Sequence, residues 1–141
     1  VLHAYLEGTG IELMANSDNV LRGGLTGKHI DVPELLNIVT FKDGGLSLIS
    51  PTTHDPMEQI YRTPADEFQL SHLRIRPGMK YEAHKRRNIE LFICISGNGT
   101  VRSRDKREIL EIKKGESFLV PASAEVYSIQ GEVELYKATV P

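Results

Sequence analysis

The second half of the chain is a succession of short alternating segments separated by glycine-containing turns, and this pattern limits the fold more than any other feature. It predicts strands over residues 69–75, 89–95, 100–104, 108–112 and 117–120, with turns over 76–79, 96–99, 104–107 and 113–115. Residues 42–67, punctuated by prolines and a Gly-Gly pair, favour loops and short strands. Strands spaced in this way are typical of an all-β sandwich or barrel, the jelly roll included.

The first forty residues follow a different pattern. Residues 1–7 and 11–15 alternate on either side of a turn signal at 7–10, which predicts a hairpin with His3, Tyr5 and Glu12 on one face. After a glycine-rich loop, Asp31-Val-Pro-Glu34 predicts a helix from residue 32 to about 39, with Asp31 as its cap. A helix this short is marginal alone, so we interpret residues 31–40 as a connector between two β units.

Composition narrows the function classes. A net charge of −2 argues against a nucleic-acid partner, and the ten Lys and Arg residues between 74 and 107 are interpreted as a solvated rim because aromatic residues are nearly absent there. The lone Cys94 lies in an apolar run and is expected to be a small buried hydrophobe. No apolar run is long enough for a membrane span, and residues 1–17 do not resemble a secretory signal, so we expect a cytoplasmic protein without membrane contact.

Residues 3–28 carry the most specific motif, because His-Ala-Tyr, Glu12, Met-Ala, Ser-Asp-Asn, Arg22 and Lys28 occur in one gapless string. This string resembles the C-terminal signature of the type I mannose-6-phosphate isomerases. Two positions depart from it: Gly23 replaces the usual Ala, and Gly27 replaces the Pro before Lys28, which leaves the backbone there less restrained. Since residue 1 is Val rather than Met and enters patterned sequence directly, we expect the chain to begin inside a larger protein.

The resemblance implies a zinc enzyme that interconverts mannose 6-phosphate and fructose 6-phosphate through an enediol. His3 matches one of the family's zinc ligands, and Arg22 matches its proposed catalytic arginine, whose permanent charge suits an enediolate. Asp18 is a second catalytic candidate, although an Asp in Asn-Ser-Asp-Asn also suits simple bonding to turn amides. The resemblance places Tyr5, Glu12 and Lys28 at the sugar pocket.

A second motif lies within the strand-rich half. Gly78, His84, Glu90 and Gly97 fall at the spacing of the first cupin motif, and Gly115 and Pro121 fit the start of the second. Arg86 and Val126 stand where two of the four metal ligands belong, and a protonated guanidinium repels a metal ion. We therefore expect this barrel to hold no metal, with Arg86 as a candidate partner for Glu90.

These observations predict an all-β, cupin-like jelly roll (a double-stranded β-helix) with one short connector helix. We expect residues 1–30 to be the final strands of a first, catalytic barrel, 31–40 the helical connector and 41–141 the C-terminal jelly roll. None of the 141 residues supplies the family's other zinc ligands, so the N-terminal part of the same protein is an expected partner. An exposed apolar edge left by the missing strands is expected to drive pairing between two copies. The alternative is a non-catalytic carbohydrate-binding or structural cupin domain.

Overall fold

The structure is a computed structural model, which describes residues 6–16, 21–24, 26–41, 48–83, 88–104, 107–124 and 126–141. The chain divides into two compact units, Val1–Leu48 and Ile49–Pro141, which are described separately below. The second unit contains every strand formed by the described residues, and the first contains the helix.

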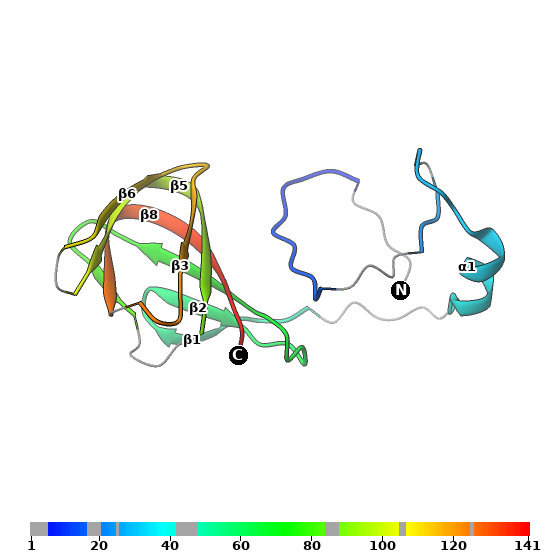
Figure 1. Ribbon diagram of the computed structural model, residues 1–141, viewed down its shortest axis with the longest axis horizontal. Coiled ribbons are helices and arrows are strands. Elements are labelled where there is room, and N and C mark those ends of the chain that lie inside the picture. The colour runs from blue at the N-terminus through cyan, green and yellow to red at the C-terminus, as the bar shows by residue number, and fades with distance from the viewer. Residues whose placement is uncertain are drawn as a thin grey trace. The chain divides into compact units, whose positions relative to one another are not determined.

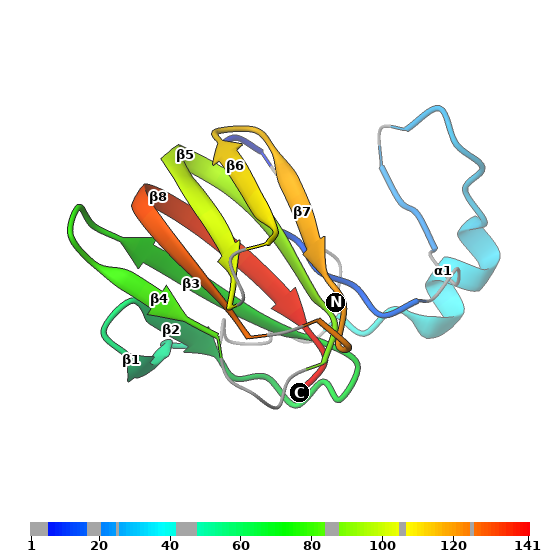
Figure 2. The same ribbon diagram turned by 60° about the vertical axis from the view of Figure 1, so that its left-hand side comes forward.

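The second unit is a single antiparallel sheet that curves around a core like a barrel, so that two layers of strands face each other (Figures 1 and 2). Its strands are β1 (Thr52–Asp55), β2 (Glu58–Tyr61), β3 (Gln69–Ile75), β4 (Lys80–Glu82), β5 (Glu90–Ser103), β6 (Ile109–Lys113), β7 (Ser117–Val120) and β8 (Tyr127–Thr139). Neighbours follow the order β1-β2-β3-β8-β5-β6, with β4 paired to β8 and β7 paired to β5. The all-β prediction is confirmed.

The long strands β5 and β8 connect the two layers. They pair with each other from Glu90↔Thr139 to Ser103↔Tyr127, so each is long enough to belong to both layers. The end of β8 pairs with β3 and its beginning with β4, whereas β5 pairs first with β7 and then with β6. This exchange of partners along one strand is what allows a single sheet to wrap around a core.

Glycines permit the bend where β5 and β8 cross between layers. Gly97 has φ +74°, and a Cβ added there would lie 1.9 Å from the carbonyl oxygen of Glu132. A bulge between Cys94 and Ser96 adds to the bend. The predicted turn at 96–99 is therefore wrong: the glycines mark a close approach of two backbones inside a continuous strand rather than a chain reversal.

The core lies between the layers and is built from alternate residues of the strands. The Phe92 ring stacks on Phe118 with centroids 4.5 Å apart, and Tyr127 meets it edge-on at 6.2 Å. Cys94 is 1% exposed, as predicted. The largest wholly buried apolar side chains are Tyr81, Phe92, Leu73, Ile75, Ile129 and Leu135. Alternation over these strands thus buries one face and leaves the other in solvent.

The first unit contains helix α1 (Val32–Ile38), one residue shorter than predicted. The Asp31 carboxylate accepts a hydrogen bond from the Glu34 backbone N–H at 3.1 Å, and Pro33 lies in the first turn, as expected. The strand predicted for residues 11–15 is absent, since these residues form no ladder. A two-stranded hairpin is marginally stable at best in water, and alternation alone does not supply partners.

None of the helices formed by the described residues has the length and apolar composition needed to cross a lipid bilayer.

Candidate functional site

The predicted catalytic string is only partly visible in the structure. His3, Tyr5 and Asp18 lie outside the described residues. Of the others, Glu12 and Lys28 are exposed and Arg22 is half-buried. No hydrogen bond or ion pair joins the side chains of these three within the described part of the chain; the Lys28 backbone N–H donates to Thr26 Oγ1 at 3.2 Å. The roles predicted for these residues therefore rest on the family resemblance and not on contacts among the described residues.

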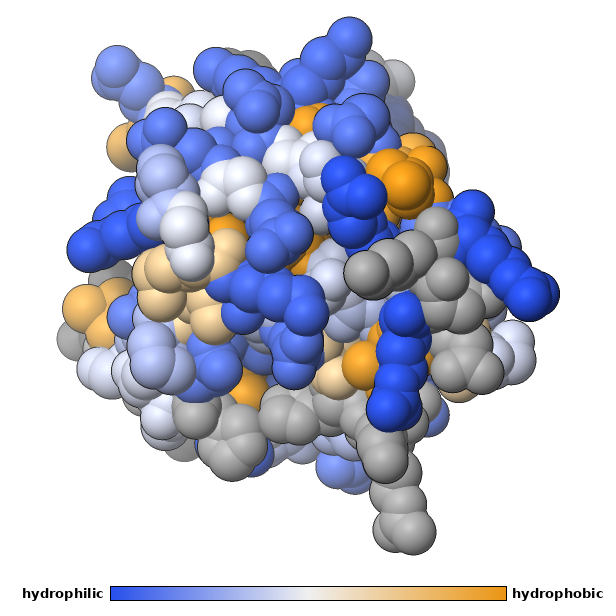
Figure 3. All heavy atoms as spheres, turned by 90° about the vertical axis from the view of Figure 1, so that its left-hand side faces the viewer, coloured by the Kyte–Doolittle hydropathy of each residue, from blue (hydrophilic) through white to orange (hydrophobic). Residues whose placement is uncertain are grey.

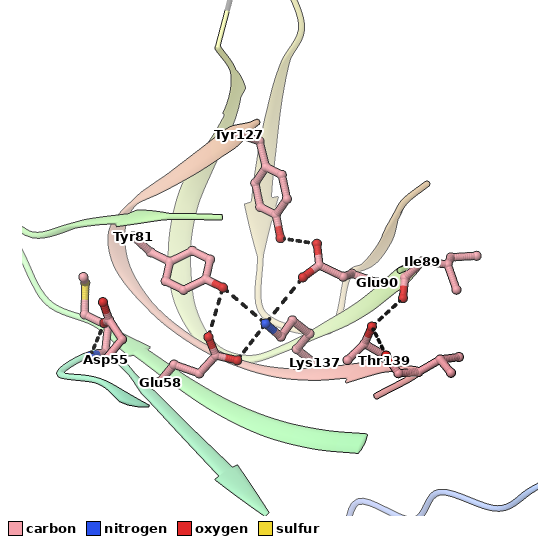
Figure 4. Close-up of polar contacts among 10 residues, drawn as sticks. Asp55, Glu58, Tyr81, Ile89, Glu90, Tyr127, Lys137 and Thr139 are labelled. Atoms are coloured by element: carbon pink, nitrogen blue, oxygen red, sulfur yellow. Dashed lines mark hydrogen bonds and ion pairs between the residues drawn. The ribbon is translucent and has the colours of Figure 1, made fainter. Parts of the chain in front are cut away.

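A different set of polar side chains converges inside the barrel (Figure 4). Lys137 extends from β8 into the interior and meets Glu58 from β2 and Glu90 from β5. All three side chains are at most 6% exposed. Two phenols complete the group, Tyr81 from β4 and Tyr127 from the start of β8. We call these five residues the buried lysine cluster.

Three oxygens lie close to the Lys137 ammonium. Its Nζ lies 2.6 Å from Glu58 Oε1, 3.2 Å from the Tyr81 hydroxyl and 3.4 Å from Glu90 Oε1. An ammonium has three N–H donors, so the number of nearby oxygens matches the number of donors. The Tyr81 hydroxyl in turn donates to Glu58 Oε2 at 3.1 Å, and the Tyr127 hydroxyl donates to Glu90 Oε2 at 2.8 Å.

Burial and neighbouring charges shift the pKa values of two members of the cluster, Glu58 and Tyr81. Burial raises the pKa of Glu58, but the charge and hydrogen bond of Lys137 outweigh it, so the pKa lies below its usual 4.5. Burial, followed by the negative charges of Glu58 and Glu90, raises the pKa of Tyr81 well above 10. At neutral pH Glu58 is therefore a carboxylate, and Tyr81 is a neutral phenol that donates to it.

The cluster also bears on the cupin motif. Glu90 points inward, where the motif predicts a ligand, while His84 and Arg86 lie outside the described residues. The structure pairs Glu90 with Lys137, a partner that the motif does not predict. Among the described residues, no group of three or more His, Cys, Asp or Glu side chains is arranged to hold a metal ion. Within the described part of the chain, the Lys137 ammonium lies 3.4 Å from Glu90 Oε1.

Sequence reasoning missed Lys137 and Glu58, although a signal for Lys137 exists. From Tyr127 the buried positions of β8 follow a period of two through Ile129, Val133 and Leu135, which brings Lys137 onto the same inward face. A lysine in phase with core residues is unusual, because lysine is almost never fully buried unless paired. The same test applied to β2 places Glu58 inside with Ile60.

One face of the molecule is mainly polar (Figure 3). Figure 3 shows one face on which hydrophilic side chains predominate and hydrophobic ones are scattered between them. On the outer side of the sheet, His72 Nε2 lies 2.7 Å from Glu134 Oε1, and its ring stacks on Tyr136. A cavity of about 380 Å³ opens beside β6 and β7, lined by Ile109, Leu110 and Phe118 among others, with Tyr127 also on its wall.

Comparison with known proteins identifies the relatives of this chain. Residues 57–140 match the family model described as the cupin domain of mannose-6-phosphate isomerase. Mannose-6-phosphate isomerase 2 of Arabidopsis thaliana is 33% identical over 98% of this chain and 31% of its own length. Mannose-6-phosphate isomerase of Escherichia coli K12 is 33% identical over 94% of this chain and 33% of its length. The chain thus spans about a third of the length of these curated relatives.

The solved structures agree. Mannose 6-phosphate isomerase from Salmonella typhimurium, in a crystal structure with fructose 6-phosphate and zinc bound, superimposes with a TM-score of 0.77 at 30% identity, over 90% of this chain and 32% of that one. The crystal structure of a mutant phosphomannose isomerase from the same organism gives a TM-score of 0.76 at 29% identity, over 89% of this chain and 31% of that one. The expected cupin jelly roll is confirmed. The chain belongs to the mannose-6-phosphate isomerase family, and its residues 57–140 form that family's cupin domain.

Proposed function

We propose that this chain is the C-terminal portion of an enzyme that interconverts mannose 6-phosphate and fructose 6-phosphate. The observation that carries the proposal is the extent of the similarity: relatives named mannose-6-phosphate isomerase match 98% of the chain, so the match includes the string with Tyr5, Glu12, Asp18 and Arg22 as well as the cupin domain. The sugar phosphate is the proposed substrate, and the N-terminal part of the same protein is the proposed partner. Cytoplasm is the proposed location.

Within this proposal, residues 1–30 are the final strands of a catalytic barrel and residues 31–40 are a connector. An aldose–ketose exchange moves a proton between C1 and C2, and negative charge develops on oxygen as the enediolate forms. Arg22 is proposed to stabilise that charge, because a guanidinium stays protonated and presents several donors. Asp18 is the proposed proton-transfer residue, and Tyr5, Glu12 and Lys28 are proposed to hold the sugar phosphate.

Zinc is the proposed cofactor of the complete enzyme, with His3 as one ligand, and would supply Lewis-acid polarisation of the substrate oxygens. The described residues of this chain do not fit a zinc site by themselves, since they contain no group of three suitable ligands. No step is therefore assigned to the metal here, and the chain alone is expected to be inactive.

Turnover by the full-length protein tests the proposal. Arg22→Ala is expected to lower kcat about 10²–10³-fold, the usual effect of removing one group that stabilises developing charge. Arg22→Lys should recover part of the loss, and Arg62→Ala, which removes an exposed arginine of the barrel, should have no effect. Turnover unchanged by Arg22→Ala would remove Arg22 from the mechanism.

A non-catalytic carbohydrate-binding or structural cupin domain is the second candidate. The self-contained core of residues 49–141 favours it, because such a unit needs no active site to be stable. Zinc titration of the full-length protein separates the two: stoichiometric zinc binding that is lost in His3→Ala favours the enzyme, and no zinc binding favours the alternative.

We also propose that two copies pair through exposed apolar side chains on the outer face of the sheet. Leu91 and Leu119 are direct cross-strand partners and are 50% and 51% exposed, and Ile93 lies beside them at 39%. Exposed apolar patches of this kind commonly mark interfaces. Sedimentation that finds only monomers at high concentration would contradict the pairing.

A further inference from the structure

The basic stretch between residues 74 and 107 contributes three of its cations to one groove on the barrel. The groove has a volume of about 740 Å³ and lies over β4, β8 and the end of β5. Its charged lining consists of three cations and one carboxylate: Lys80, Glu82, Arg102 and Arg104. The described lining residues therefore carry a formal excess of two positive charges, although the whole chain has a net charge of −2.

The strand register fixes how these side chains are spaced. Ser128 on β8 is the direct cross-strand partner of both Glu82 on β4 and Arg102 on β5. Lys80 and Gln130 form the neighbouring pair on the same face, two residues along. Because neighbouring strands lie about 4.8 Å apart, side chains from β4 and β5 can reach one small ligand placed over β8.

The two arginines have donors that the protein does not use. Arg102 and Arg104 are two positions apart, and such positions on an extended chain share a face. The Arg104 backbone N–H donates to the Val126 carbonyl at 2.7 Å, which fixes the chain just beyond the end of β5. Apart from the charge interaction of Arg104 with Glu82, neither guanidinium has a hydrogen bond or ion pair with the described residues. These donors are therefore available to an anion from solution.

An exposed ion pair occupies the opposite side of the groove. Lys80 Nζ lies 2.5 Å from Glu82 Oε1, and the two side chains are 47% and 66% exposed. The hydrogen bond from Lys80, then the charges of Lys80 and Arg104, lower the pKa of Glu82 below its usual 4.5. Exposed ion pairs are weak, so an anion that carries two negative charges can compete with this carboxylate for the cations.

We propose that this groove binds a phosphate dianion, either free or as the phosphate group of a small phosphorylated molecule. Arg102 and Arg104 are its main ligands, because a guanidinium presents a planar fork of donors that matches phosphate oxygens. Lys80 supplies a third cation, and the Ser128 hydroxyl and Gln130 amide can bond to the remaining oxygens. The volume lies within the range of small-molecule sites. The groove includes none of the residues proposed to act on substrate, so the inference does not depend on the proposed function.

Calorimetric titration of the 141-residue chain with inorganic phosphate tests this inference at pH 8, where phosphate is mainly a dianion. Binding should saturate at one equivalent, and the affinity should fall as sodium chloride is added, because salt screens exposed charges. Fructose 6-phosphate is titrated in parallel. Tighter binding than that of inorganic phosphate identifies a sugar phosphate as the ligand, and equal or weaker binding identifies free phosphate.

Variants of the groove assign the binding to it. Arg102→Ala and Arg104→Ala should each weaken phosphate binding about three- to tenfold, since each removes charge-assisted hydrogen bonds at a partly screened site. Glu82→Gln should strengthen binding about two- to fivefold, because it removes the competing carboxylate. Arg62→Ala is the matched control: it removes an exposed arginine outside the groove and should leave the affinity unchanged.

The Glu82→Gln variant keeps the test decisive, because a misfolded groove would not bind more tightly. Arg22→Ala separates this site from the residues proposed to act on substrate, and should also leave the affinity unchanged. The inference is overturned if neither ligand binds saturably, if Arg62→Ala or Arg22→Ala weakens binding as much as Arg102→Ala does, or if Glu82→Gln binds no more tightly than the unmodified chain.

Discussion

The two units of this chain differ in how their sequence relates to their structure. Residues 3–28 match the family signature closely, yet none of the described residues before Ile49 is buried. Residues 49–141 match the glycine and proline positions of the cupin motif but lack two of its metal ligands, yet they form a continuous core. A catalytic signature can be identified from residue types and their spacing in the sequence. A barrel core, in contrast, is identified from which side chains are buried together in the structure. Substitutions in the two units should therefore act on different measurements.

The largest expected difference concerns stability. Phe92→Ala removes a ring that is 2% exposed and stacked on Phe118, and should lower the free energy of unfolding by about 3–5 kcal/mol. Leu36→Ala in α1 removes a side chain that is 60% exposed and should change it by less than about 0.5 kcal/mol. Urea denaturation of the two variants measures the contrast, and equal losses would show that the first unit has a core of its own.

The bend in β5 provides the next test. Gly97→Ala should cost more than about 2 kcal/mol, because it combines a positive φ with a backbone contact that cannot be relieved without shifting β8. Gly78→Ala is a matched control with φ +83° and open space around the added carbon, and should cost about 1–2 kcal/mol. If the denaturation midpoints of the two variants coincide, the close approach at Gly97 does not constrain the barrel.

Acid should weaken the barrel through the buried lysine cluster. The pKa of Glu58 is lowered in the folded state, so its contribution to stability is fully present above the unfolded value of 4.5 and is lost as the pH falls through the lower folded value. Glu58→Gln should flatten this part of the stability–pH curve, while Glu67→Gln, at an exposed carboxylate, should leave it unchanged. A Glu58→Gln curve as steep as that of the unmodified chain would contradict the assignment.

The smallest expected effect is confined to the first unit. Asp31→Ala removes the cap of α1 and should destabilise the helix by about 1 kcal/mol, whereas Asp31→Asn should retain most of the capping. Amide hydrogen exchange at Leu35, whose N–H donates to the Asp31 carbonyl, reports the change directly. The thermal midpoint of the barrel should not move, and a shift would mean that the helix contributes to barrel stability.

Much of the fold follows from local signals. Strand β3 has the predicted bounds, β6 and β7 lie within one residue of theirs, and α1 begins where its cap and proline indicate. The strand prediction ends at residue 120, whereas β8 is the central partner of both β3 and β5. Gly131 and the buried Lys137 interrupt the alternation of apolar residues in β8, so a prediction from hydrophobicity alone does not detect this strand.

The candidate sites divide in the same way. His3, Arg22 and the neighbouring residues are identified by their resemblance to the family signature, and their roles remain predictions that depend on other parts of the protein. The cupin motif correctly predicts that Glu90 points inward, but it does not predict the partner of Glu90. Lys137 lies 47 positions later in the chain and meets Glu90 only when β5 pairs with β8. A spacing motif describes ligands that lie close together in the sequence. It does not detect a side chain from a strand far along the chain that takes the place of a ligand.

The sequence by itself determines that this chain is β-rich, where its short strands and its helix cap lie, and to which family its signature belongs, because alternation, turn residues and motif spacing are local properties. The tertiary structure alone decides that residues 96–99 continue a strand and that Lys137, Glu58 and Glu90 share one interior point. The physical reason is that a glycine or a lysine is compatible with several environments. Pairing between distant strands selects one of them, since burial makes an unpaired charge or a misplaced Cβ too costly.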